Sequence, residues 1–180
     1  MRNLRDALKV DGWMTFNELS WLRATALSLP PGAKIFEVGS WKGRSAVALA
    51  VDQAILTCVD TFRGGAQDVT RGLADRQNIF GMFTANMKRL KLRPNIWKMT
   101  SLEAVALLPS ESVDMVFDDS DHNDKFETHF WAWYRKIKPG GIYCGHDYQA
   151  LFPEIPRVLI ASGLKFSVIP GTMIWALRKQ

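Results

Sequence analysis

The chain has 180 residues, 47% of them hydrophobic and 23% charged, with a formal net charge of +5. This size and composition are typical of one globular domain with a sizeable core. They argue against a membrane-spanning protein, because no stretch approaches the roughly 20 consecutive apolar residues of a span. Two cysteines provide neither a disulfide framework nor a zinc motif.

The distribution of charge indicates which partners to expect, and the cysteines indicate the cellular compartment. Much of the positive charge is local, in Lys88, Arg89, Lys91, Arg93 and Lys98. A run of this kind at a helix end is usually solvated, and it lacks the aromatics or the module of a nucleic-acid interface. We therefore expect no nucleic acid and no membrane as partners. Cys58 and Cys144 lie in apolar runs as buried thiols, and residues 1–6 lack the apolar region of a secretory signal, which together predict a cytoplasmic protein.

The first 30 residues have a helical pattern. Residues 3–10 form a short helix that breaks at Asp11 and Gly12, and the residues from Thr15 to Glu18 form a capping box for a second helix. Helical spacing then continues through Leu19, Leu22, Ala26 and Leu29. We expect one domain over residues 1–180, with residues 1–30 as a helical cover and 33–180 as the core. Plain packing and covering a ligand cleft are alternative roles for this cover.

Residues 35–50 are the most informative segment. An apolar run at 35–38 predicts a buried strand, two glycines follow, and the small residues at 45–50 predict a helix. Such a corner suits a ligand, because glycine allows a sharp turn and the helix start has free N–H groups. The spacing Glu37-x-Gly39-x-x-x-Gly43-x-Ser45 matches neither the dinucleotide fingerprint nor a P-loop. An ordinary tight turn is the alternative.

The second strand is predicted at residues 54–59 and ends at Asp60. An acidic residue at this place, about twenty residues past a glycine loop, can accept hydrogen bonds from ribose hydroxyls. Capping of the following turn is the alternative role. Residues 61–77 are polar and glycine-bearing without strong periodicity, which is typical of a lid or binding loop.

Strands and helices alternate through the rest of the chain. We predict helices at 78–90, from 100 onward, at 125–136 and ending at 159–162; strands at 96–99, 113–117 and 142–144; and a closing hairpin from 164–169 and 173–177. This order predicts an α/β protein with a Rossmann-like doubly wound sheet, mostly parallel with a terminal antiparallel strand.

Carboxylates recur where these strands end. Glu37, Asp60, Asp119 and Asp147 each lie at or just past a predicted strand end. Ligands bind at this edge of open α/β sheets, and four carboxylates gathered there are costly without partners. The pattern therefore predicts a binding site at this edge.

Several motifs at the same edge resemble one family. They are the residues at 117–122 (Phe-Asp-Asp-Ser-Asp-His), 138–141 (Lys-Pro-Gly-Gly), 146–148 (His-Asp-Tyr), 59–62 (Val-Asp-Thr-Phe) and 100–103 (Thr-Ser-Leu-Glu). With the glycine corner, they resemble class I S-adenosylmethionine (SAM)-dependent methyltransferases, specifically the small-molecule and sugar O-methyltransferase-like family of the methyltransferase domain 24 type. The resemblance covers about residues 33–148. It implies SAM as cofactor, held by Glu37, Gly39, Ser40, Gly43, Ser45, Asp60, Thr61, Ser101 and Asp119.

The resemblance also implies catalytic and metal roles. By position, Asp119 and Asp147 correspond to acids that bind magnesium in metal-dependent relatives, and His122 to a base. Asp119, Asp147 and His146 are thus the candidate ligands for Mg²⁺ or Mn²⁺. The sequence departs from the family at His146, because an imidazole replaces a carboxylate and favours manganese or later metals. The metal site is therefore weaker, differently loaded or empty. Asp119 or Asp121 capping a helix, and His146 donating to a backbone carbonyl, are the structural alternatives.

The leading hypothesis is a SAM-dependent methyltransferase that methylates a hydroxyl of a small-molecule acceptor, with or without a divalent metal. One alternative is a SAM-binding protein that senses or scaffolds without catalysis. Another is a nicotinamide-dependent oxidoreductase, which the missing glycine triple disfavours. Seven tryptophans in a chain of this size leave room for an apolar interface in a homo-oligomer.

Overall fold

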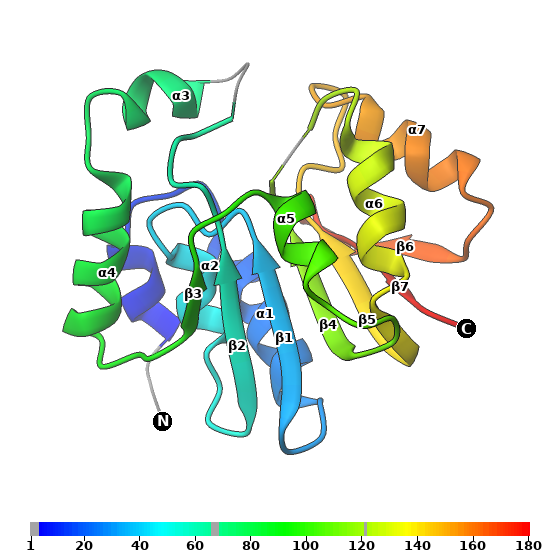
Figure 1. The fold of residues 1–180 in the computed structure, drawn as a ribbon, viewed down its shortest axis with the longest axis horizontal. Coiled ribbons are helices and arrows are strands. Elements are labelled where there is room, and N and C mark those ends of the chain that lie inside the picture. The colour runs from blue at the N-terminus through cyan, green and yellow to red at the C-terminus, as the bar shows by residue number, and fades with distance from the viewer. Residues whose placement is uncertain (1–3, 66–68, 121) are drawn as a thin grey trace.

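The computed structural model describes residues 4–65, 69–120 and 122–180. Its centre is a seven-stranded sheet in the order β3-β2-β1-β4-β5-β7-β6 (Figure 1). The strands are β1 (Ala33–Val38), β2 (Ala54–Val59), β3 (Asn95–Trp97), β4 (Val113–Asp118), β5 (Ile137–Gly145), β6 (Phe166–Val168) and β7 (Trp175–Arg178). The first five strands pair in parallel, and β7 runs antiparallel to both β5 and β6. The predicted doubly wound sheet with a terminal antiparallel strand is confirmed.

Helices cover both faces of the sheet (Figure 1). They are η1 (Leu4–Lys9), α1 (Phe16–Leu27), α2 (Arg44–Leu49), α3 (Val69–Ala74), α4 (Ile79–Arg89), α5 (Ser101–Ala106), α6 (Phe126–Tyr134) and α7 (Glu154–Ala161). On one face, Leu22 of α1 and Phe83 of α4 belong to a core cluster. On the other, Trp133 of α6 and Leu159 of α7 belong to a second cluster. No described helix is long and apolar enough to cross a membrane.

The predicted capping box at Thr15 forms as expected, and a second one forms at Thr100. The Thr15 hydroxyl accepts from the Glu18 backbone N–H at the start of α1, and Thr100 does the same with Glu103 at the start of α5. In turn, the carboxylate of each glutamate accepts a hydrogen bond from the backbone N–H of its threonine. These bonds satisfy N–H donors that the start of a helix would otherwise leave without partners. Sequence pattern and local structure agree at both helix starts.

Several boundaries differ from the sequence prediction. Strand β5 begins at Ile137 and includes the predicted turn at residues 139–141, because Gly140 takes a φ of 76° and the pairing with β4 shifts register there. Strand β3 is shorter and ends at Trp97. The predicted lid at residues 61–77 contains helix α3, while residues 66–68 lie outside the described residues, as does Asp121. The lid itself stays a prediction.

Strand register places one row of residues along the carboxyl edge. Val38 pairs with Val59 of β2 and with Asp118 of β4, and Asp118 pairs with Gly145 of β5. The residues that directly follow these four are therefore level with one another. Backbone hydrogen bonds between neighbouring strands continue as far as these residues. This row consists of Gly39, Asp60, Asp119 and His146.

The glycines of the first corner are required by protein packing. A Cβ on Gly39 would collide with the carbonyl oxygen of Asp119, and one on Gly43 would lie 2.5 Å from Met87. Both glycines also have positive φ, of 88° and 93°. The Asp119 backbone after β4 and the side chains of α4 therefore occupy the space that a Cβ would need at these two glycines.

The two cysteines lie in the sheet as predicted. Cys58 in β2 and Cys144 in β5 are both fully buried, and both are free. Burial raises the pKa of each thiol above its ordinary value, because a thiolate loses its hydration there.

Substitution of Gly39 by alanine should destabilise the fold through contact with β4. We expect Gly39→Ala to lower the free energy of unfolding by about 1–3 kcal/mol more than Gly32→Ala, measured by urea denaturation. Gly32 is a matched control, because its φ of +81° is similar and a Cβ added to it would meet no atom within 4 Å. Equal losses would show that backbone strain alone sets the cost at Gly39.

Candidate active site

The carboxyl edge brings three predicted site residues together. His146 Nδ1 lies 3.2 Å from Asp147 Oδ1 and 3.7 Å from Asp119 Oδ1. One ligand atom from each of Asp119, His146 and Asp147 lies within 4.8 Å of the others, which is close enough to share one ion. Asp147 has a φ of 60°, a left-handed conformation that aspartate tolerates better than most residues. The alternative of Asp119 as a helix cap is wrong, since Lys125 is the N-cap of α6.

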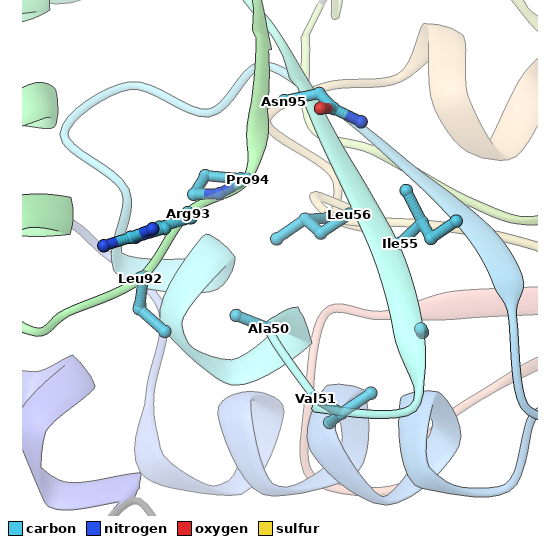
Figure 2. A pocket seen from close by; sticks show the side chains of 9 residues that line it. Ala50, Val51, Ile55, Leu56, Leu92, Arg93, Pro94 and Asn95 are labelled. Carbon is cyan, nitrogen blue, oxygen red and sulfur yellow. The ribbon is translucent and has the colours of Figure 1, made fainter.

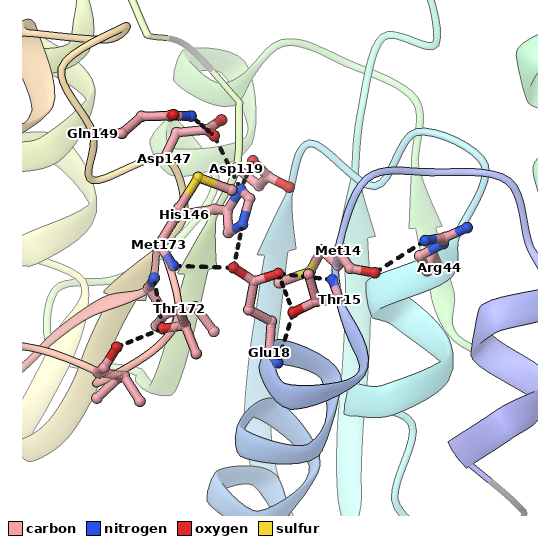
Figure 3. A network of polar contacts seen from close by, with 12 residues as sticks. Met14, Thr15, Glu18, Arg44, Asp119, His146, Asp147, Gln149, Thr172 and Met173 are labelled. Carbon is pink, nitrogen blue, oxygen red and sulfur yellow. Dashed lines mark hydrogen bonds and ion pairs between the residues drawn. The ribbon is translucent and has the colours of Figure 1, made fainter.

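A glutamate from the N-terminal helix completes this cluster. Glu18 is 1% exposed, and its Oε1 lies 3.1 Å from His146 Nε2 (Figure 3). His146 therefore contacts carboxylates through both ring nitrogens, so the expected bond to a backbone carbonyl is replaced by ion pairs. The ring is fixed between α1 and the end of β5.

These contacts set the charges of the cluster. Burial alone lowers the pKa of His146, but hydrogen bonds with Asp147 and Glu18 outweigh it and raise that pKa to about 11. Burial works to raise the pKa of Glu18, and the bonds from His146 and the Met173 backbone lower it to about 2. For Asp119, burial prevails and raises its pKa well above its usual range. The cluster therefore holds a cationic imidazole between carboxylates at neutral pH.

His122 lies at the same cluster. Its Nε2 is 3.2 Å from Asp147 Oδ2, and its ring packs against Phe152 with centroids 4.6 Å apart. Asp147 thus contacts both histidines, one through each carboxylate oxygen. An imidazole oriented by a carboxylate is a common arrangement for a general base. The expected convergence of Asp119, His122 and Asp147 is present.

Asp60 lies beside the glycine corner. Its Oδ2 accepts from the Trp41 backbone N–H at 2.7 Å, and its Oδ1 accepts from the Phe62 N–H at 2.5 Å. Burial raises its pKa, although these hydrogen bonds oppose the shift. The Ser40 backbone N–H also bonds this carboxylate. Asp60 therefore does cap the following turn, and its three backbone donors leave about one of its four lone-pair sites for another donor.

Orphan polar atoms lie beneath the glycine loop. Both carboxylate oxygens of Glu37 and the hydroxyl of Ser40 are buried and have no hydrogen-bond partner among the described residues. Ser40 and Ser45 are nevertheless close enough to Glu37 to oppose the rise in its pKa that burial causes. A buried carboxyl without a partner is costly, so these atoms mark a place where a ligand could supply donors.

The remaining predicted cofactor residues have protein partners. Ser101 is buried and its hydroxyl accepts from Trp133 Nε1 at 2.8 Å. The Thr61 hydroxyl accepts from the Arg63 backbone N–H at 3.3 Å. Both side chains keep an O–H donor that these bonds do not use. Ser101 lies at the start of α5, on the face opposite α1 and α2.

Comparison with known proteins decides the family. A family model described as a methyltransferase domain matches residues 36–148, which is more than half of the chain. The chain belongs to the SAM-dependent methyltransferase family. The match spans the glycine corner, Asp60 and the whole cluster from Asp119 to Asp147, as the resemblance indicated. A comparison with curated proteins finds no match.

Solved structures agree with this methyltransferase in fold. An O-methyltransferase from Bacillus cereus in complex with SAH has 16% identity and a TM-score of 0.67, over 98% of this chain and 90% of that one. A precorrin-6y C5,15-methyltransferase from Geobacter metallireducens has 13% identity and a TM-score of 0.69, over 93% and 90%. A cofactor-bound protein from MTB, Rv0187, has 16% identity and a TM-score of 0.71, over 98% and 87%. At these identities the likeness concerns the fold alone.

Sequence reasoning missed two contacts of this methyltransferase. The capping box identified Glu18 as a helix-start residue, but nothing in the sequence indicates that its second oxygen reaches His146. Lys42 in the glycine loop is 3% exposed and bonds Asp11 Oδ2 at 2.6 Å and Gln77 Oε1 at 2.9 Å. The loop is thereby held to the N-terminal segment on one side and to the segment that leads into α4 on the other.

A cavity of about 240 Å³ lies at the opposite end of the sheet (Figure 2). Its lining includes Ala54 and Leu56 of β2 and Asn95 at the start of β3. Leu92 and Arg93, which precede β3, also line it. Ligands of open α/β sheets bind at the carboxyl ends of strands, so this cavity is separate from the candidate active site.

The methyltransferase should lose stability at alkaline pH through His146. Its folded pKa of about 11 exceeds the ordinary value of 6.5, so the protonated ring stabilises the fold fully below about pH 6.5, and this contribution is lost as pH rises toward 11. We expect the free energy of unfolding, measured with urea in EDTA, to fall between about pH 7 and pH 10. His146→Gln should fall less over the same range, and parallel curves for the two proteins would contradict this assignment.

Proposed function

We propose that this methyltransferase binds SAM between the glycine corner and Asp60 and transfers its methyl group to a hydroxyl of a small-molecule acceptor. The observation that carries the cofactor site is the orphan carboxyl of Glu37 together with the orphan Ser40 hydroxyl. The ammonium group of the methionine part of SAM supplies the donors that Glu37 lacks. The SAH complex of the Bacillus cereus protein, which shares this fold, supports the same ligand class.

Each predicted cofactor residue then has a distinct task. The lone pair of Asp60 that the backbone donors leave open accepts from a ribose hydroxyl in a charge-assisted hydrogen bond. Gly39 and Gly43 keep the loop tight against β4 and α4, so that the loop backbone stays at the edge. Ser45 lies in the first turn of α2 beside Glu37, and Thr61 and Ser101 follow β2 and β3 with O–H donors that their bonds to Arg63 and Trp133 do not use. When bound, SAM supplies an activated methyl group for in-line displacement.

In this proposal, His122 and Asp147 remove the proton from the acceptor hydroxyl. A tautomer of His122 that donates from Nε2 to Asp147 leaves its Nδ1 lone pair to take the hydroxyl proton. Asp147 holds that imidazole in orientation, and the cationic His146 beside it offsets the charge of the carboxylates. Asp119 lies next to the glycine loop, where the acceptor oxygen must approach the methyl group. Alignment of these groups is the main contribution that the protein makes.

A divalent metal also fits this donor set. Asp119, His146 and Asp147 would hold it, and Glu18 would be the outer carboxylate that a metal-binding imidazole usually has. One imidazole with two carboxylates suits Mn²⁺ better than Mg²⁺, and such an ion would lower the pKa of a coordinated hydroxyl. Binding must displace the proton that His146 Nδ1 otherwise carries toward Asp147.

Removal of the Asp60 charge should weaken SAM binding. We expect Asp60→Asn to raise the Kd for SAM by a factor that corresponds to about 1–3 kcal/mol, measured by titration calorimetry. Asparagine retains only one of the two oxygens that accept from the Trp41 and Phe62 N–H groups, so the urea midpoint of the variant is measured beside its Kd to separate a lost ribose contact from a distorted loop. Asp6→Asn, on η1, is the control and should bind as the parent does. Unchanged affinity in Asp60→Asn would place the ribose elsewhere. Gly43→Val is a poor test, because its Cβ would collide with Met87.

Loss of the cluster should stop turnover without loss of cofactor. We expect Asp119→Asn, Asp147→Asn and His122→Ala to keep the parental Kd for SAM and to methylate at least about 100-fold more slowly. The measurement is methyl transfer from radiolabelled SAM to a panel of hydroxylated small molecules, including sugars, in EDTA and with added Mn²⁺. Asp124→Asn, an exposed neighbour, is the control.

Parental rates in all three variants would show that the cluster is structural. If the parent binds SAM and methylates nothing in the panel in either condition, the non-catalytic SAM-binding alternative is favoured.

A further inference from the structure

The carboxylate of Glu18 joins three elements. Its Oε2 accepts from the Thr15 backbone N–H at 2.7 Å and the Thr15 hydroxyl at 2.8 Å, which completes the capping box of α1. Its Oε1 accepts from the Met173 backbone N–H at 3.0 Å and contacts His146 Nε2 at 3.1 Å. Figure 3 shows this carboxylate between the start of α1, the residue after β5 and the segment before β7.

Capping alone does not account for the burial of Glu18. Glu103 makes the same capping box with Thr100 at the start of α5, with contacts of 2.8 and 2.7 Å, and it does so at the exposed surface. Burying a carboxylate is costly unless it gains partners. The partners that distinguish Glu18 from Glu103 are Met173 and His146, and both contact Oε1. The contacts of Oε1 therefore explain why the Glu18 side chain is buried.

His146 in turn depends on Glu18 for its orientation. The ring has carboxylates at both edges, with Glu18 at Nε2 and Asp147 at Nδ1. A ring turned by half a rotation about its Cβ–Cγ bond would lose both contacts. The bond to Glu18 thus fixes the Nδ1 edge toward Asp119 and Asp147. Because α1 is packed into the core through Leu19 and Leu22, both 0% exposed, the anchor is rigid.

We infer that Glu18 is a positioning residue of the active site, which acts from the N-terminal helix by holding the Nδ1 edge of His146 against Asp119 and Asp147. The catalytic consequence rests on the proposed function, whereas the placement of His146 does not. The helical segment before β1 thereby becomes part of the active site as well as a cover for the sheet. Whether the cluster holds a metal or only protons, the Oε1 atom of Glu18 fixes the orientation of the His146 ring.

Three substitutions separate positioning from capping. Glu18→Gln keeps a side chain that a capping box accepts at this position but removes the charge that faces His146. Thr15→Ala removes the cap and leaves the contact of Glu18 with His146. Glu103→Gln makes the same chemical change in the matched capping box of α5.

The first readout is the side-chain ¹H–¹⁵N spectrum of the histidines in EDTA without SAM, which is simple because the chain has three histidines. We expect Glu18→Gln to move or broaden the ring signals of His146. Thr15→Ala should leave those signals in place while lowering the urea midpoint, and Glu103→Gln, which keeps a capping-box side chain, should leave the signals in place with little change in the midpoint. Unchanged His146 signals in Glu18→Gln would overturn the inference. If that variant does not fold, Glu18→Asp, whose shorter carboxylate cannot span Thr15 and His146, should give the same spectral change.

The second readout is kinetic. With an acceptor from the panel, we expect Glu18→Gln to lower kcat at least tenfold while KM for SAM stays within twofold, and Thr15→Ala to change neither. A displaced His146 with parental kcat would overturn the catalytic part of the inference. Failure of the parent to bind SAM would instead count against the proposed function, and the spectra would still decide whether Glu18 positions His146.

Discussion

The in-register pairing of four parallel strands is the constraint on which the site depends. Val38, Val59, Asp118 and Gly145 are level in the sheet, so the next residue of each strand reaches the edge together. A shift of one residue would turn every side chain to the other face of its strand. The glycine loop, Asp60 and the cluster of Asp119, His146 and Asp147 are therefore neighbours because the apolar strands beneath them are aligned.

The alignment also concentrates charge, and the fold compensates for it locally. Asp119 and Asp147 lie beside one imidazole, and Glu18 lies on its far side. Lys42, which belongs to the glycine loop, is buried and forms an ion pair with Asp11. Glu18, His146 and Lys42 are buried, and each has a partner of opposite charge, which is the condition for keeping charges out of water. Glu37 differs from them, because neither of its carboxylate oxygens has a hydrogen-bond partner among the described residues.

Much of this arrangement could be predicted from the sequence. Apolar runs and capping boxes identified the strands and helix starts, since both depend on local spacing, and the acids after the strands followed from topology. The contact of Glu18 with His146 could not be predicted, because it joins residues 128 positions apart through packing of α1 against the sheet. A second constraint on Gly39, its close packing, could not be predicted for a related reason. Its neighbour is the Asp119 carbonyl on another strand, which no local pattern reveals.

The two buried thiols divide the sheet in a useful way. Cys58 lies in β2 and Cys144 in β5, on opposite sides of the central β1–β4 pair, and each thiol is sealed from solvent. A thiol reagent can therefore reach them only when the strand that carries them opens. Labelling of each cysteine reports separately on the half of the sheet near Asp60 and the half near Asp147. The native chain thus contains its own pair of probes for whether the two halves of the active-site edge open together or apart.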